Sequence, residues 1–138
     1  MAYSATAYFQ KLTDILLNIG VTDGRGNSIA LDEGMDRAVK MILDVAERSG
    51  KVLLIGNGGS SAIVSHMQSD LGKGAGVQAL VFNEAPLLTA FSNDIGYEYA
   101  FGFMTELFAK EGDLLLSISS SGQSPNILRA VNQAVDSG

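Results

Sequence analysis

KVLLIGNGGS, residues 51–60, carries the clearest structural signal in this chain of 138 residues. The run from Val52 to Ile55 is continuously apolar, which is typical of a strand buried on both faces of a parallel sheet. Glycines and Ser60 interrupt the run, and a helical pattern follows from Ser61 to Leu71. The stretch therefore predicts a strand that passes through a glycine-rich turn into a helix.

The same succession of strand, turn and helix recurs toward the C-terminus. Further strands are predicted at 77–82 and 113–119, and further helices at 87–91, at 99–108 and from Pro125 onward. Ser124 and Pro125 suit the N-cap and the first position of that last helix. The alternation predicts an α/β fold with a parallel sheet.

Two helices are predicted before the sheet. Apolar residues recur at helical spacing over 8–19 and 35–46, with turn signals between them at 21–30. Gly50 is the predicted left-handed residue after the second helix. We expect one domain over residues 1–138, with a helical segment at 1–50 and the α/β core at 51–138. A further strand is expected after the last helix, so this domain is predicted to be incomplete at its C-terminus.

Composition excludes several classes of protein. The formal net charge is −6 and the nine basic residues form no cluster, which argues against the basic groove of a nucleic-acid-binding protein. No apolar run reaches the roughly 18–20 residues of a membrane helix, and the first residues lack the basic start of a signal peptide. The absence of cysteine excludes disulfides and thiolate metal ligands. We expect a cytoplasmic protein that contacts neither a membrane nor nucleic acid directly.

Two predicted strands end in groups that bind anions. In an open α/β sheet, ligands bind beyond the carboxyl ends of the strands. After the first strand, glycines let the backbone approach a ligand, and Ser60 adds a hydroxyl near a helix N-terminus. After the third strand, four hydroxyls surround Gly122, contributed by Ser119, Ser120, Ser121 and Ser124. Such neutral donors at helix N-termini suit a phosphate monoester.

Each of these turns also has a simpler interpretation. A glycine cluster after a strand is often only a tight turn, and a serine-rich loop alone is most often a solvated linker. The glycine spacing does not match the dinucleotide-binding fingerprint. Because both turns are expected at strand ends of one sheet, their combination favours a phosphate site.

Two pairs of residues leave alternatives open. His66 and Asp70 are four residues apart, so they share one helical face, either as a surface pair of small energetic value or as two metal ligands or a base and its neighbour. Spacing alone favours the surface pair. Asn93 and Asp94 precede Gly96, and spacing alone favours a turn there over a contact with sugar hydroxyls.

On these residues the sequence resembles the sugar isomerase (SIS) domain superfamily, and within it the phosphoheptose isomerases, also called sedoheptulose-7-phosphate isomerases. The matching blocks are GNGGS at 56–60, a histidine six residues later, SNDIGY at 92–97 and EGDLLLSISSSGQSPNI at 111–127. The resemblance implies a flavodoxin-like parallel sheet with helices on both faces, preceded by two helices. It also implies that the family's last strands are absent from this chain.

The resemblance implies an activity and a site. The activity is aldose–ketose isomerisation of sedoheptulose 7-phosphate to D-glycero-heptose 7-phosphate through an enediol. Substrate would be bound by Asn57, Gly58, Gly59, Ser60, Asp70, Asn93, Asp94, Ser119, Ser120, Ser121 and Ser124. His66 and Asp70 would be catalytic and would ligate one Zn²⁺ per subunit. The family's enzymes are homotetramers with active sites between subunits, so a homo-oligomer and a phosphorylated sugar are the expected partners.

The sequence departs from the family's pattern in three places. Asp70 stands where the family has glutamate, which shortens the carboxylate by one methylene. The segment 71–77 is short, and its only basic residue is Lys73, whereas relatives carry a longer loop that contains arginine. A glutamine and a histidine from the family's last third have no counterpart here. Two alternatives therefore stay open: a non-catalytic SIS module that binds a phosphosugar or a protein, such as a replication-initiator-associating protein, and an SIS enzyme with another phosphosugar.

Overall fold

The computed structural model describes residues 4–138 and divides into two compact units, one ending at Lys40 and one beginning at Met41. The first unit holds α1 (Ala5–Leu17), β1 (Val21–Thr22), β2 (Ser28–Ile29) and the first part of α2 (Leu31–Glu47). The second holds the end of α2 and all later elements. Both N-terminal helices are therefore present, as predicted.

The predicted loop at 21–30 is instead a short antiparallel hairpin, in which Val21 pairs with Ile29. Asp23 organises its turn: the carboxylate accepts the backbone N–H groups of Arg25 and Asn27, each at 2.9 Å. The hydrogen bond from the Asn27 side chain is the main reason that the pKa of Asp23 lies below its ordinary value. Two residues per strand are too few to give the alternating pattern from which a strand is predicted.

The second unit is built on a parallel sheet of three strands, in the order β4 (Gln78–Val81), β3 (Lys51–Gly56) and β5 (Leu114–Ile118). The apolar run that follows Lys51 forms the central strand, and each of its residues from Val52 to Ile55 is at most 1% exposed. The predicted buried strand and parallel sheet are therefore confirmed.

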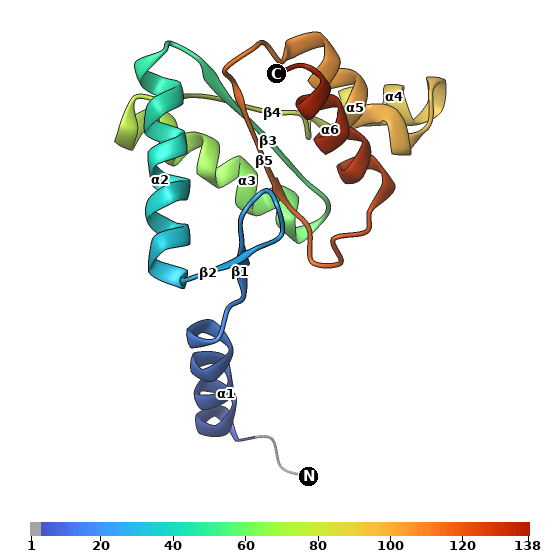
Figure 1. The fold of residues 1–138 in the computed structure, drawn as a ribbon. Helices are drawn as coiled ribbons and strands as arrows, with labels where there is room; N and C mark the ends of the chain where they lie inside the picture. Colours follow the sequence, from blue (N-terminus) through green and yellow to red (C-terminus); the bar gives the residue numbers. More distant parts are fainter. Residues whose placement is uncertain (1–3) are drawn as a thin grey trace. The chain divides into compact units, whose positions relative to one another are not determined.

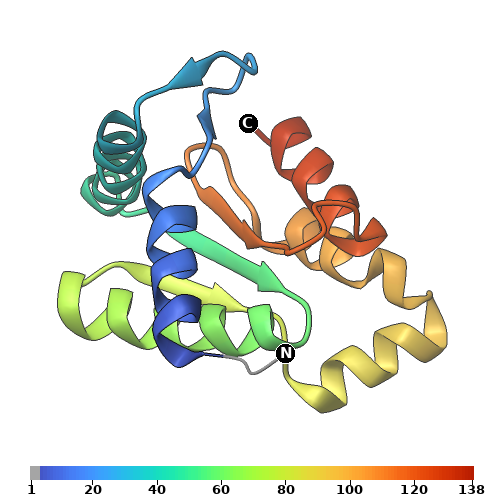
Figure 2. The same cartoon turned by 90° about the horizontal axis from the view of Figure 1, so that it is seen from below.

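Helices cover both faces of this sheet (Figures 1 and 2). They are α3 (Gly59–Asp70), the short π-helical η1 (Leu71–Ala75), α4 (Ala85–Asp94), α5 (Tyr97–Phe108) and α6 (Pro125–Asp136). Because side chains alternate along β3, Leu53 and Ile55 point to one face and Val52 and Leu54 to the other. Each pair joins a separate hydrophobic cluster, so the two-faced α/β architecture is confirmed.

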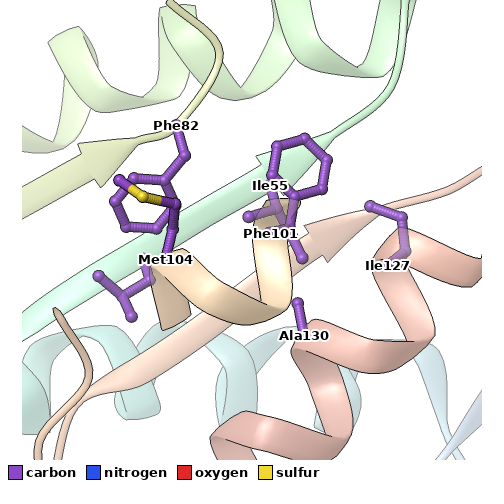
Figure 3. Close-up of a cluster of buried hydrophobic side chains, with 7 residues drawn as sticks. Ile55, Phe82, Phe101, Met104, Ile127 and Ala130 are labelled. Atoms are coloured by element: carbon purple, nitrogen blue, oxygen red, sulfur yellow. The ribbon is translucent and has the colours of Figure 1, made fainter. Parts of the chain in front are cut away.

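The two clusters position different helices. On one face, Leu53 and Ile55 pack with side chains from α5, α6 and the residue after β4 (Figure 3), namely Phe82, Phe101, Met104, Ile127 and Ala130. On the other face, Val52 and Leu54 pack with Val45 of α2, Val64 of α3 and Val77. The first cluster fixes α6 against β5, and the second fixes α3 against β3.

Two element ends differ from the predictions. The left-handed residue after α2 is Ser49, with φ of 57°, and not Gly50. The N–H groups of Ser49 and Gly50 bond back to the carbonyls of Ala46 and Val45, which is the Schellman arrangement one residue earlier than expected. Helix α4 continues through Asp94, so the break is confined to Ile95 and Gly96.

No helix among residues 4–138 is long and apolar enough to cross a membrane.

Candidate functional site

The glycine-rich turn of residues 56–60 links β3 to α3 and requires glycine at two positions. A Cβ at Gly56 would lie 2.8 Å from the backbone carbon of Ser60, so the turn has no room for a side chain there. Gly58, the N-cap of α3, has φ of 53° and ψ of −120°, which only glycine adopts readily. No side chain caps this helix, so the turn presents backbone N–H groups at a positive helix end.

The serine turn of residues 119–124 links β5 to α6. The hydroxyl oxygens of Ser119 and Ser121 accept the backbone N–H groups of Gly122 and Gln123, each at 3.1 Å. Gly122 has φ of 64°, which lets the turn close. Ser124 is the N-cap of α6 and Pro125 its first residue, as predicted, yet the Ser124 side chain forms no capping hydrogen bond. The hydroxyl of Ser124 is thus available to a ligand.

The two turns lie side by side at one end of the sheet (Figure 1). β3 and β5 are adjacent parallel strands, and Gly56 pairs in register with Ile118. Two asparagines connect the glycine-rich turn to the first turn of α6, which follows the serine turn: the Asn57 side-chain amide donates to Asn126 Oδ1 at 3.0 Å, and the Asn126 amide donates to Asn57 Oδ1 at 2.9 Å. The Tyr97 hydroxyl donates to the same Asn57 oxygen at 2.7 Å.

The structure brings together most of the predicted binding residues. They are Asn57, Gly58, Gly59 and Ser60 in the glycine-rich turn, and Ser119, Ser120, Ser121 and Ser124 in the serine turn. Their side chains and backbone N–H groups are neutral hydrogen-bond donors at the N-termini of α3 and α6. A phosphate group, with several acceptor positions on each oxygen, is the chemical complement of such a set.

His66 and Asp70 lie farther along α3, away from its N-terminus. The His66 Nε2 and Asp70 Oδ2 atoms are 3.6 Å apart, and the side chains are 80% and 63% exposed. The prediction, made from their spacing, that the two side chains lie on one face of the helix is confirmed. Their catalytic and metal-binding roles stay predictions.

Asn93 and Asp94 occupy the last turn of α4, where the Asn93 amide donates to Asp94 Oδ1 at 2.8 Å. The interpretation of this pair as a turn is wrong, because the apolar side of α4 packs onto the sheet cluster through Leu87, Leu88 and Phe91 and carries the helix through both polar residues. They lie four and three residues before Tyr97, and their role in sugar binding stays a prediction.

A zinc site at His66 and Asp70 is a prediction from the resemblance. Zinc in proteins is held by four ligands, or by three with an open position. Within residues 4–138, no group of three or more acidic, histidine or cysteine side chains converges in a way that could hold a metal ion. His66 and Asp70 are residue types that can ligate zinc, but two ligands do not complete such a site, so zinc binding at this pair stays a prediction.

Asn126 and Tyr97 are site residues to which the sequence analysis gave no role. Both fall within the blocks SNDIGY and SPNI, which carried the resemblance, yet their contacts join positions 69 and 40 residues from Asn57 along the chain. The sequence gives one indication of a role for Asn126. It lies in the first turn of a predicted helix that follows a strand, where polar side chains commonly bind free N–H groups.

Known proteins are similar to this chain over most of its length. A family described as "SIS domain" matches residues 7–138. The chain is 37% identical over 111 residues to the phosphoheptose isomerase of Proteus mirabilis strain HI4320, covering 77% of this chain and 58% of the relative. It is 35% identical over 112 residues to that of Helicobacter pylori strain 26695, with the same coverage. The chain thus spans less than two thirds of the length of these relatives.

Two solved structures share the fold. The phosphoheptose isomerase of Neisseria gonorrhoeae superposes with a TM-score of 0.81 at 27% sequence identity, and that of Francisella tularensis with a TM-score of 0.80 at 29%. Each match covers 96% of this chain and 68% of the other. The similarity therefore extends over almost the whole of the described structure.

Proposed function

Since the chain belongs to the SIS domain family, we propose that it binds the phosphate group of an open-chain sugar phosphate where its glycine-rich and serine turns meet. One observation carries this proposal: the reciprocal amide pair of Asn57 and Asn126 holds the two donor-rich turns together at adjacent strand ends. A dianionic group placed there meets the N-termini of two helices and several hydroxyls.

The proposed reaction is the isomerisation of sedoheptulose 7-phosphate to D-glycero-heptose 7-phosphate, in keeping with the names of the relatives. A base removes a proton from C1 of the ketose while the C2 oxygen gains one, which gives an enediol. The C1 hydroxyl then loses its proton to become the aldehyde as C2 is protonated. Asp70, with His66 beside it, is the proposed group for the carbon proton transfer.

The activity is tested with the full-length protein. We expect added sedoheptulose 7-phosphate to yield the aldose, detected by chromatography or by coupling to an aldose-specific reagent. Asp70→Asn is expected to slow turnover by two to four orders of magnitude, the range of a lost general base. Turnover that survives in Asp70→Asn would assign proton transfer to another group, and lack of turnover in the wild type would contradict the activity itself.

One observation favours a second candidate, a module that binds a phosphosugar without isomerising it. The proposed acid–base pair is largely exposed to solvent, whereas catalytic groups usually act where water is excluded. Calorimetric titration separates the candidates. Binding of sedoheptulose 7-phosphate without turnover in the full-length protein supports the module, and binding with turnover supports the enzyme.

Zinc, a homotetramer with shared sites, and a cytoplasmic location belong to the same proposal. Large apolar side chains on α1 support an oligomer, since Tyr8, Phe9 and Leu17 are each more than half exposed. A shared site is also the arrangement in which His66 and Asp70 would gain the further ligands that zinc needs. Light scattering gives the oligomeric state, and elemental analysis of the purified full-length protein gives its zinc content.

A further inference from the structure

Four polar groups form a hydrogen-bond network that joins the glycine-rich turn to the first turns of α5 and α6. Asn126 Oδ1 accepts two hydrogen bonds, from the Asn57 side chain and from the backbone N–H of Ile127, each at 3.0 Å. Asn57 Oδ1 also accepts two, from the Asn126 side chain and from the Tyr97 hydroxyl. Each carbonyl oxygen has two lone pairs, so both acceptors are fully used.

The direction of every bond in this network follows from one backbone group. The Ile127 N–H also donates to the carbonyl of Ser124 at 3.0 Å, and it can only donate. An Asn126 nitrogen in the place of Oδ1 would set two donors 3.0 Å apart, so the side-chain oxygen must face the Ile127 N–H. The Asn126 nitrogen then faces Asn57, which requires the Asn57 oxygen there. Tyr97 must in turn act as the donor to that oxygen. The network therefore has a single consistent arrangement.

Asn126 is buried, whereas Tyr97 is 43% exposed and reaches the core only through the contact of its ring. Asn126 is 2% exposed and is followed by the buried Ile127. The Tyr97 ring packs against Phe101, with centroids 6.3 Å apart, and Phe101 belongs to the cluster shown in Figure 3. Helices α5 and α6 thus both bond to the side chain of Asn57. The two bonds between Asn57 and Asn126 are partly buried and gain strength from the low local dielectric, whereas the bond from Tyr97 is exposed.

We propose that Tyr97 and Asn126 are positioning residues, which fix the glycine-rich turn at the distance from the serine turn that one phosphate group requires. This inference rests on the proposed function, because it assumes a ligand shared by both turns. It also refines the role of Asn57. The Asn57 oxygen has no acceptor capacity left for a sugar hydroxyl, so Asn57 contributes N–H donors to the ligand and not an acceptor.

Tyr97→Phe removes one hydroxyl from the network and keeps the ring that packs on Phe101. Tyr99→Phe is the matched control, since Tyr99 lies on the same helix and its ring contact with Arg129 does not need the hydroxyl. Calorimetry with sedoheptulose 7-phosphate and with inorganic phosphate measures the effect. We expect Tyr97→Phe to weaken both ligands about three- to tenfold, the scale of one lost hydrogen bond. Tyr99→Phe is expected to change neither.

A second measurement needs no ligand. In ¹H–¹⁵N spectra, Tyr97→Phe is expected to shift the backbone amides of residues 119–124, which lie in the opposite turn, while Tyr99→Phe leaves them unchanged. Asn126→Asp, which cannot donate to Asn57, is expected to give the larger shifts of the same residues.

The outcomes separate the two proposals. If the wild type binds and Tyr97→Phe binds equally well, the positioning role is wrong and the proposed function stands. If the wild type binds neither ligand, the proposed function fails. The spectra then show by themselves whether Tyr97 and Asn126 couple the two turns. If the amides of residues 119–124 are unshifted in both Tyr97→Phe and Asn126→Asp, the proposed positioning role is wrong. A lower melting temperature with unchanged phosphate affinity would mean that Tyr97 is merely structural, which also overturns the proposal.

Discussion

At the scale of single residues, Gly56 and Gly59 give opposite expectations for the same substitution. In Gly56→Ala the new Cβ would lie 2.8 Å from backbone of Ser60, so the turn must shift, at a cost of about 1–3 kcal/mol in the free energy of unfolding. A Cβ at Gly59 meets nothing within 4 Å, so Gly59→Ala is expected to be neutral or slightly stabilising. Chemical denaturation measures the free energy of unfolding of the two variants. An equal loss of this free energy in both would contradict the described turn.

Ser49 offers a route to a more stable protein. Its φ of 57° at the end of α2 is a conformation that costs a residue with a side chain about 1–2 kcal/mol relative to glycine. Ser49→Gly is therefore expected to raise the free energy of unfolding by about 0.5–1 kcal/mol, since the greater freedom of glycine in the unfolded chain offsets part of the gain. A stability unchanged or lowered in denaturant melts would show that Ser49 is not left-handed.

Ser120 tests the ligand contact apart from the structure of the turn. Ser119 and Ser121 accept backbone hydrogen bonds within the turn, so their removal disturbs the turn as well as any ligand contact. Ser120 is exposed, and Ser120→Ala is expected to weaken binding of sedoheptulose 7-phosphate by about 1–3 kcal/mol, the scale of a hydrogen bond to a charged group. Ser28→Ala, in the hairpin of the first unit, serves as the control in the same titration. Equal affinity in Ser120→Ala would remove that hydroxyl from the site.

At the scale of elements, one ion pair ties β3 to the start of β5 at the sheet end opposite the turns. Asp113 accepts hydrogen bonds from the Lys51 side chain and from the backbone N–H groups of Lys51 and Lys110. The Asp113 and Lys51 side chains are only 7% and 17% exposed. Burial by itself would raise the pKa of Asp113, but these hydrogen bonds outweigh it and hold the pKa below its ordinary value.

This lowered pKa predicts how stability depends on pH. The folded protein holds the Asp113 proton more weakly than the unfolded chain, so the pair stabilises the fold above about pH 4, the ordinary range of a carboxyl group, and loses its effect as the pH falls through the lower folded pKa. Asp113→Asn is expected to unfold more easily at pH 7 and to show a flatter loss of stability below pH 4. Urea melts from pH 2 to pH 7 measure this, with exposed Asp36→Asn as the control. Equal slopes in wild type and Asp113→Asn would contradict the assignment.

The sequence predicted elements best where hydrophobic pattern decides them. The run from Val52 to Ile55 could be placed because a strand between two covered faces needs apolar side chains on both. The adjacency of the two turns followed from parallel strand ends. The hairpin at Val21–Ile29 could not be predicted, because two paired residues leave no periodicity. The contacts of Asn57 with Asn126 and Tyr97 depend on tertiary packing between distant segments, and no local pattern encodes them.

At the scale of the whole molecule, residues 57–60 and 119–124 are proposed to donate hydrogen bonds to one shared phosphate group. Titration of ¹⁵N-labelled protein with sedoheptulose 7-phosphate tests it most directly, since each backbone amide reports separately. We expect the amides in both turns to shift together and to yield one common dissociation constant. Shifts confined to one turn, or different dissociation constants for the two turns, would contradict a shared site.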